Sequence, residues 1–480
     1  MDPASFRRHG HDLVDWIAEY LEHSEKYPVL SRVKPGEIAA ALPSHAPEES
    51  EPFEAIMADF ERVLVPGLTH WNHPGFLAYF AITGSAPGVL ADFLSAALNQ
   101  QAMLWRTSPA ATELEAVALG WLRQLIGLPD AFEGVIYDTA SIASMHALAA
   151  AREASIADVR VRGLAGRVDV PRIRVYCSDQ AHSSIDKAVM TIGLGHEALR
   201  KIDVDADYRM RAEALRDAIV EDRRNGLLPI AVVATVGTTS TTSIDPVPAI
   251  ADICERERLW LHVDAAYAGV AAMLPSHAHI LDGAGRADSL VVNPHKWLFT
   301  PFDLSAFYCR RMDVVRAAFS LTPEYLRTAE AGQVKNLMDT GIQLGRRFRS
   351  LKLWMILRSF GARAIRERLS EHIRLAQVLA AWIDAHQDFT RIAPVPFSVV
   401  CFRWTPAGLA LPEEALDAAN EQLITLVNQT GEVLLSHTRL RGRIVLRIAI
   451  GHLETTERHV RRAWDLLVEH AATLARRSER

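Results

Sequence analysis

The stretch SLVVNPHKW (residues 289–297) joins a short apolar segment, with the composition of a buried strand, to a polar turn that contains Lys296. A second stretch, LHVDAAY (residues 261–267), places Asp264 in the same way at the end of an apolar segment. Each stretch therefore puts one ionisable side chain beside a buried strand. A charge in such a place is costly unless a partner compensates for it.

Short apolar segments alternate with segments of helical periodicity from about residue 86 onward. The expected strands cover residues 134–136, 173–177, 230–235, 259–263 and 290–292, and the expected helices include 87–98, 109–127 and 141–154. This alternation is typical of a mostly parallel sheet with helices on both faces. Ligands on such sheets bind at the carboxyl ends of the strands. Five polar side chains follow expected strands: Thr139, His182, Thr239, Asp264 and Lys296.

The same pattern divides the chain into three parts. Residues 1–85 form a helical segment with too little apolar mass to fold alone, so we expect it to pack on a partner subunit. Residues 86–351 are expected to form a large domain, and residues 352–480 a small α+β domain. The polar segment 323–342 interrupts the alternation and is expected to be a long, mobile, functional loop.

The composition is that of a folded globular protein, with 480 residues, of which 49% are apolar and 23% charged. A net charge of −6 gives no basic surface for nucleic acid. No apolar run approaches the roughly 18 residues of a membrane span, and residues 1–12 lack the apolar core of a signal peptide. The four cysteines lie far apart, without the spacing of a metal site or a disulfide framework. We therefore expect a cytoplasmic enzyme without a metal.

Lys296 and Asp264 together are the pair that a pyridoxal phosphate (PLP) site requires. The lysine amine forms a Schiff base with the cofactor aldehyde, and the aspartate keeps the pyridine nitrogen protonated. Considered separately, each residue has a simpler interpretation. Lys296 would be a surface lysine after a turn, and Asp264 would be a carboxylate that caps a turn. The pairing of the two makes the cofactor site the better interpretation.

The segment Thr139-Ala140-Ser141 lies between an expected strand and an expected helix. Hydroxyls and free backbone N–H groups at a helix N-terminus suit the cofactor phosphate, although an ordinary helix cap uses the same residues. The preceding residue, Asp138, conflicts with this interpretation because its carboxylate repels a phosphate.

Three further side chains have two interpretations each. An imidazole at position 182 is able to stack on the pyridine ring, but a lone histidine such as His182 is as often structural. One interpretation of Thr239 is a hydrogen bond to the cofactor, and the other is a structural role in a polar turn. Tyr325 lies in the expected loop. One interpretation is that it donates a proton to a carbanion, and the other is that it is an incidental loop residue.

Several long motifs occur in an order that resembles the aromatic L-amino-acid decarboxylase family, the group II PLP-dependent decarboxylases of fold type I. The resemblance covers nearly the whole chain. The matching motifs are PGLTHW (66–71), SPAATELE (108–115), DQAHSS (179–184), HVDAAYAG (262–269), NPHKWL (293–298) and LGRRFRSLK (344–352).

The resemblance implies an α/β fold of the aspartate-aminotransferase-like type. Its large domain has a mostly parallel seven-stranded sheet, preceded by an N-terminal helical segment and followed by a small C-terminal α+β domain. It also implies an intertwined homodimer whose active sites are shared across the interface, an amino acid as the small-molecule substrate, and PLP as the cofactor.

The resemblance also implies roles for individual residues. Lys296 is the Schiff-base lysine, Asp264 the pyridinium partner, and Tyr325 the proton donor to Cα. His182 stacks on one ring face, Ala266 backs the other, and Thr239 contacts the cofactor. The implied phosphate ligands are Thr139, Ala140, Ser141, Asn293 and His295. The implied substrate pocket is lined by Trp71, Tyr79, Phe80, Ile82, Gln101, Met103 and Gly345.

The chain departs from the family pattern around the phosphate and the substrate. Tyr137-Asp138 stands where the family often has Gln-Gly or Gly-Gly, and Ile142 stands where a glutamate is usual. In the pocket, Gln101-Ala102-Met103 replaces the usual Ile- or Val-Gly-Phe. The alternatives for the Arg106 cation are binding of an acidic substrate, a salt bridge, or exposure to solvent. These departures leave the substrate open.

The leading hypothesis is a PLP-dependent carboxy-lyase that converts an aromatic L-amino acid (tryptophan, DOPA, tyrosine or phenylalanine) into the amine and CO2. One alternative is a decarboxylation-dependent aldehyde synthase, which the family produces when the loop tyrosine or the stacking histidine is replaced. A decarboxylase of a non-aromatic amino acid is another. The third is a PLP-fold protein without catalysis, supported only by Tyr137-Asp138.

Overall fold

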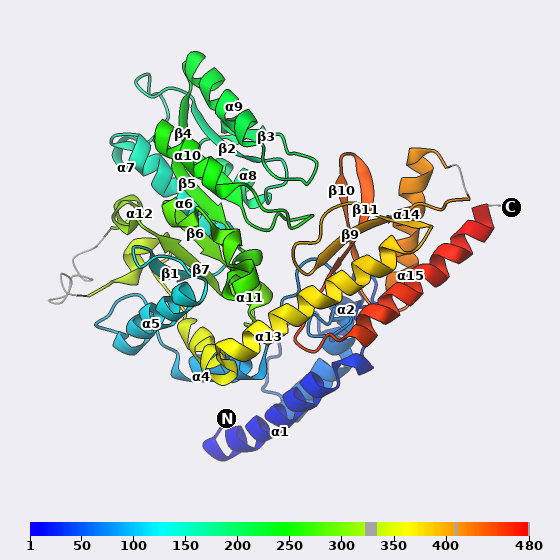
Figure 1. The fold of residues 1–480 in the computed structure, drawn as a ribbon. Coiled ribbons are helices and arrows are strands. Elements are labelled where there is room, and N and C mark those ends of the chain that lie inside the picture. The colour runs from blue at the N-terminus through cyan, green and yellow to red at the C-terminus, as the bar shows by residue number, and fades with distance from the viewer. Residues whose placement is uncertain (322–333, 409–410, 479–480) are drawn as a thin grey trace. The chain divides into compact units, whose positions relative to one another are not determined.

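The computed structural model describes residues 1–321, 334–408 and 411–478, which fold into two compact units (Figure 1). The larger unit consists of residues 82–376 and 393–400, and the smaller of residues 1–81, 377–392 and 401–480. Residues 1–81 therefore belong to the same compact unit as the C-terminal residues 401–480. The boundaries predicted after residues 85 and 351 stay a prediction.

A seven-stranded sheet forms the centre of the larger unit, with the strand order β1-β7-β6-β5-β4-β2-β3. Its strands are β1 (Glu133–Tyr137), β2 (Ile173–Ser178), β3 (Leu199–Ile202), β4 (Leu228–Thr235), β5 (Trp260–Asp264), β6 (Ser289–Val292) and β7 (Ser305–Cys309). Neighbouring strands from β3 to β6 pair in parallel, whereas β7 is antiparallel to both of its neighbours. The predicted fold, an α/β protein with a mostly parallel seven-stranded sheet, is confirmed.

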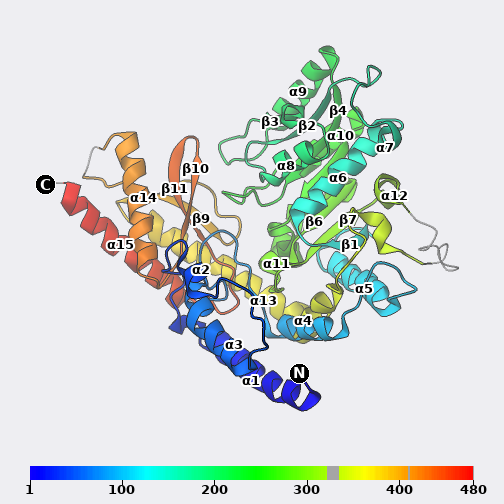
Figure 2. The same ribbon diagram turned by 180° about the vertical axis from the view of Figure 1, so that it is seen from behind.

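Helices cover both faces of this sheet (Figures 1 and 2). Helix α6 (Ala140–Ser155) packs on β4 to β7, next to α8 (Ser184–Thr191) and α12 (Met312–Phe319), and α9 (Ala212–Arg224) and α10 (Val247–Glu257) pack together against β4. The alanines of α6 explain its close approach to the sheet, because Ala143, Ala147 and Ala150 are fully buried in the core.

In the described part of the chain, the larger unit has five further α-helical segments, of which α5 packs on β1, α7 on α6 and α11 on β7. They are α4 (Ala86–Leu98), α5 (Pro109–Leu125), α7 (Val159–Arg162), α11 (Pro294–Trp297) and the first part of α13 (Ser350–Asp384). Prolines in the first turns of α4, α5 and α11 are favourable, because that turn has backbone N–H groups without helical partners. Helix α13 is interrupted at Gly361, whose φ of 69° is left-handed.

The smaller unit combines helices with a four-stranded sheet of order β10-β11-β9-β8. Its elements are α1 (Pro3–Glu22), α2 (Glu37–Ala41), α3 (Phe53–Asp59), β8 (Phe389–Arg391), β9 (Val399–Trp404), α14 (Glu413–Gln429), β10 (Ser436–Leu440), β11 (Arg443–Ala449) and α15 (Glu457–Ser478). Asp2 caps α1, since its carboxylate accepts hydrogen bonds from the N–H groups of Ala4 (2.9 Å) and Ser5 (3.0 Å). Across the described ranges, none of the helices has the length and apolar composition needed to span a bilayer.

The register of the parallel strands determines where the candidate site lies. Thr235 on β4 pairs with Asp264 on β5, and Asp264 pairs with Val291 on β6. The carboxyl ends of three adjacent central strands therefore lie side by side, and the turns that follow them converge on one edge of the sheet.

Candidate active site

Asp264 ends the central strand β5, and its side chain is only 6% exposed. Its carbonyl accepts the Val236 N–H (2.8 Å), and its carboxylate accepts the Ala266 N–H (3.1 Å). The sheet thus fixes the backbone of Asp264 from one neighbouring strand and the side chain from its own turn. A carboxylate held at this depth favours a cation as its partner.

Lys296 lies in the short helix α11, directly after β6. Its N–H donates to the carbonyl of Asn293 (2.9 Å), and the Asn293 N–H donates to the carbonyl of Ala266 (2.9 Å). The turn after β6 is therefore tied to the turn after β5. These two bonds bring the lysine of one motif beside the aspartate of the other.

His182 follows β2 and shares the electrostatic environment of both residues. Desolvation is the main influence that lowers the pKa of His182; Lys296 lowers it further, and Asp264 raises it. The His182 Nδ1 accepts the Ser184 N–H (3.1 Å) and lies 2.8 Å from the Ser184 Oγ, so the neutral ring carries its proton on Nε2. The predicted trio of His182, Asp264 and Lys296 thus lies together in one site.

The predicted phosphate segment forms the N-terminus of α6. Thr139 is the N-cap, and its hydroxyl accepts the Ile142 N–H at 3.5 Å. The N–H groups of Ala140 and Ser141 lie in the first turn, where a helix has donors to offer an anion. The same residues therefore form an ordinary helix cap and present N–H donors of the kind that bind a phosphate.

Asn293 and His295 are buried on the neighbouring turn. The Asn293 Oδ1 accepts a hydrogen bond from the Ser305 Oγ (2.6 Å), and the Asn293 amide nitrogen lies 3.3 Å from the His295 Nε2. The His295 Nδ1 accepts the Leu304 N–H (3.0 Å), and burial, the largest cause, lowers the pKa of His295 to about 3. His295 is therefore neutral at physiological pH and donates from Nε2.

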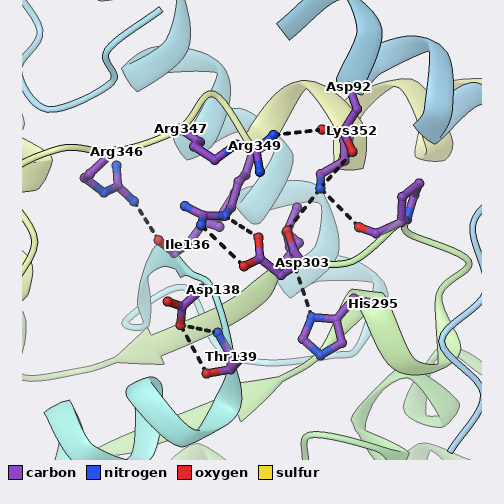
Figure 3. A network of polar contacts seen from close by, with 12 residues as sticks. Asp92, Ile136, Asp138, Thr139, His295, Asp303, Arg346, Arg347, Arg349 and Lys352 are labelled. Atoms are coloured by element: carbon purple, nitrogen blue, oxygen red, sulfur yellow. Dashed lines mark hydrogen bonds and ion pairs between the residues drawn. The ribbon is translucent and has the colours of Figure 1, made fainter. Parts of the chain in front are cut away.

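A network of buried charges supports these turns (Figure 3). The Lys352 side chain is 1% exposed, and its Nζ donates to the carbonyls of Pro301 and Asp303 (both 3.1 Å) and pairs with Asp92 (3.2 Å). Arg349 donates to the Asp303 carboxylate (2.7 Å). The network fixes residues 301–304, which hold His295. Sequence patterns did not reveal it, because its members are far apart in the chain.

A second buried ion pair was also missed by sequence reasoning. The Arg346 Nη2 lies 2.7 Å from both the Glu115 Oε1 and the Ile136 carbonyl, and the Ile136 N–H donates to the same Glu115 oxygen (2.8 Å). This pair joins α5, the end of β1 and the segment before α13. Both residues lie in motifs that carried the family resemblance, but no local spacing indicated that they pair.

Tyr137, a departure from the family pattern, is accommodated inside the unit. Its ring packs edge-on against His146 (4.5 Å between ring centroids), and its hydroxyl donates to the Thr340 carbonyl. A Cβ at Gly341 would come within 2.8 Å of His146 and 3.3 Å of Tyr137. The missing side chain at Gly341 thus leaves space that the larger Tyr137 needs.

The residues predicted to line the substrate pocket are divided between the two compact units. The Gln101 Oε1 accepts the Arg346 N–H (2.8 Å), and a Cβ at Gly345 would lie 3.3 Å from the Gln101 Nε2. The Met103 carbonyl accepts the Met338 N–H (3.0 Å). Ile82 belongs to the same unit, whereas Trp71, Tyr79 and Phe80 belong to the smaller one.

Three of the other residues singled out in the sequence lie in the described part of the chain, and one does not. Thr239 is partly exposed in the turn after β4, and Ala266 is 5% exposed in the turn after β5. Arg106 is exposed. Tyr325 lies outside the described residues, so its role as the proton donor stays a prediction.

The site geometry agrees with three similarities to known proteins. A family model described as the pyridoxal-dependent decarboxylase conserved domain matches residues 35–405. The chain belongs to the pyridoxal-dependent decarboxylase family. Phenylacetaldehyde synthase of Arabidopsis thaliana is 39% identical over 99% of this chain and 97% of its own length. Tyrosine decarboxylase 4 of Petroselinum crispum is 38% identical over 99% of this chain and 94% of its own.

A solved structure of this decarboxylase family extends the similarity to three dimensions. The crystal structure of Oryza sativa TDC with PLP and tryptamine has a TM-score of 0.95, 38% identity and 99% coverage of both chains. The predicted family, cofactor and reaction class are confirmed: this decarboxylase is a PLP-dependent carboxy-lyase. Its residues fit the cofactor, because a buried carboxylate, a lysine and a set of anion donors converge at the strand ends.

His146 of this decarboxylase gives a prediction about acid stability. Among the described residues, neither of its ring nitrogens has a hydrogen-bond partner, and burial lowers its pKa to about 3. Between pH 3 and 6.5 only the unfolded chain protonates this side chain, so folding stability is lost as the pH falls below 6.5. The loss is about 1.4 kcal/mol per pH unit, or about 2 kcal/mol at pH 5.

His146→Leu removes this proton uptake. We expect the variant to match or exceed the wild type in thermal stability at pH 7, and its advantage to widen steadily toward pH 5. Thermal unfolding followed at several pH values tests this, with the exposed His437→Leu as a matched control. Parallel pH curves for His146→Leu and the wild type would contradict the prediction.

Proposed function

We propose that this enzyme decarboxylates an aromatic L-amino acid to the corresponding amine and CO2. The convergence of Lys296, Asp264 and His182 at the carboxyl ends of the parallel strands carries the proposal. The similarity over nearly the whole chain to enzymes named for tyrosine supports the aromatic substrate. The structural neighbour solved with tryptamine, an aromatic amine, supports it as well.

Each site residue has a physical role in this proposal. When bound, PLP supplies an aldehyde that reacts with amines and a ring that accepts electrons from the breaking bond between Cα and the carboxylate. Lys296 supplies the amine that anchors the cofactor and yields to the substrate amine. Asp264, held as an anion, keeps the proton on the pyridine nitrogen. His182 would cover one face of the bound ring, and Ala266 would back the other.

The remaining residues hold and orient the cofactor. Thr139, Ala140 and Ser141 offer N–H and hydroxyl donors to the phosphate from the N-terminus of α6. Asn293 and His295 offer side-chain N–H groups from the neighbouring turn. Thr239 supplies a further polar contact after β4. Tyr325 would deliver a proton to Cα and thereby complete the amine.

We also propose that the enzyme works as a homodimer. Leu90, Phe93, Leu94 and Leu98 on α4 are 45–54% exposed, and their spacing places them along one face of the helix. Such an apolar face is typical of a surface that a second subunit covers. We expect the active sites of such a dimer to be shared across the interface.

A cytoplasmic location agrees with the state of the cysteines. All four, namely Cys177, Cys254, Cys309 and Cys401, are buried and free. Buried free thiols are typical of proteins from reducing compartments.

An aldehyde synthase is the second candidate, favoured by the 39% identity to a phenylacetaldehyde synthase. That enzyme and the tyrosine decarboxylase are almost equally similar to this chain, so overall similarity does not separate the two outcomes. The chain keeps both the tyrosine at position 325 and the histidine at position 182. Both residues favour protonation of Cα, and therefore the amine.

Product analysis with purified, PLP-loaded enzyme tests the proposal. The panel contains L-tryptophan, L-DOPA, L-tyrosine, L-phenylalanine, L-histidine, L-glutamate and L-methionine, with amine and aldehyde followed by mass spectrometry. We expect amine from at least one aromatic member and none from Lys296→Ala. Product from a non-aromatic member alone would overturn the substrate class, and aldehyde as the main product would favour the second candidate.

Tyr325→Phe separates the two chemical outcomes. Without the phenolic proton, the carbanion lives longer and reacts with oxygen, so we expect amine formation to fall at least tenfold while aldehyde and peroxide appear. The ratio of amine to aldehyde, with peroxide measured in parallel, reports this shift. Tyr208→Phe, at a buried tyrosine outside the site, is the matched control. An unchanged amine yield in Tyr325→Phe would remove the proposed proton-donor role.

A further inference from the structure

We propose that Asp138 competes with the cofactor phosphate for the donors of Thr139 and thereby weakens the affinity of this enzyme for PLP. The inference rests on the proposed role of Thr139 as a phosphate ligand. It concerns the residue that departs from the family pattern beside the phosphate segment.

The geometry of Asp138 places its carboxylate on the donors that an anion would use. Its Oδ1 accepts the Thr139 N–H at 2.5 Å and lies 3.1 Å from the Thr139 Oγ1, which donates to it. Its Oδ2 lies 3.4 Å from the Gln343 Nε2. Figure 3 shows the Asp138 side chain facing Thr139 at the end of β1, with both contacts to the same oxygen.

The competition follows from the position of these donors. Thr139 is the N-cap of a 16-residue helix, so its N–H and the adjacent first turn favour a negative charge. A carboxylate one residue earlier reaches the donors without any change of the backbone. A phosphate that binds there has to displace Asp138 and then lies close to a second negative charge.

Three of the cations drawn around Asp138 in Figure 3 are paired with other carboxylates. Arg346 pairs with Glu115 (2.7 Å), Arg349 with Asp303 (2.7 Å) and Lys352 with Asp92 (3.2 Å). These ion pairs hold the walls of the site together. Repulsion between the Asp138 carboxylate and the phosphate would then oppose PLP binding.

Equilibrium binding to the apoenzyme tests the proposal without any need for turnover. PLP and pyridoxal, which lacks the phosphate, are titrated into the wild type and Asp138→Asn, and binding is followed by absorbance. We expect Asp138→Asn to bind PLP about tenfold more tightly and pyridoxal with unchanged affinity. Asp217→Asn, at an exposed carboxylate on α9, is the matched control and should leave both affinities unchanged.

Two results would overturn the proposal: equal or weaker PLP binding by Asp138→Asn, or an equal gain for pyridoxal. Asp138→Gly is titrated in the same way in case the asparagine variant does not fold, with thermal unfolding of each apoenzyme as the check. The test is separate from the proposed function. If the enzyme forms no product from the aromatic panel, the PLP affinities can still be measured. If the enzyme is an active aromatic decarboxylase and Asp138→Asn leaves the affinities unchanged, only this inference is overturned.

Discussion

The buried negative charge of Asp264 is the constraint on which the rest of the site depends. A carboxylate in the centre of a sheet is stable only with a cationic partner and fixed hydrogen bonds. The backbone of β5 and the Ala266 N–H supply the hydrogen bonds. A protonated pyridine ring would be a suitable cationic partner for this carboxylate. The charge of Asp264 and the chemistry of PLP therefore require each other.

The parallel sheet brings the other functional groups to this charge. Because β4, β5 and β6 end at the same edge, the turns that follow them are neighbours even though they are distant in the sequence. Lys352 and Lys296 both lie in this region, and their surroundings differ. Lys352 is held by two carbonyls and Asp92, which use its three N–H donors, so it acts as a structural cation. Lys296 lies on the turn that is tied to Asp264, which suits reaction with the cofactor.

The sequence predicted the central strands and the residues that follow them, because both leave local signals. Strand β3 was missed since two of its four residues, Arg200 and Lys201, are charged. Strand β7 was missed because it follows a short irregular connection and runs antiparallel, which breaks the alternation of strand and helix. The seven-stranded architecture came from the family resemblance. Local pattern alone did not reveal it.

The supporting interactions could not be predicted in the same way. Glu115 and Arg346 are 231 positions apart, and only the folded chain brings them together. The conflict expected at Tyr137-Asp138 has two different outcomes. Tyr137 fits because Gly341 has no side chain, whereas Asp138 does occupy donors of the phosphate segment. The predicted pocket residues are divided between the two compact units of the chain, so the pocket stays a prediction.

The most direct test of this account is to locate the covalent attachment of the cofactor. The PLP-loaded enzyme is reduced with sodium borohydride, digested and mapped by mass spectrometry. The account predicts a stable pyridoxyl label on Lys296, in the peptide that contains NPHKW, and none on Lys352. A label on Lys352 or on any other lysine, with Lys296 unmodified, would contradict the assignment of the strand-end cluster as the active site.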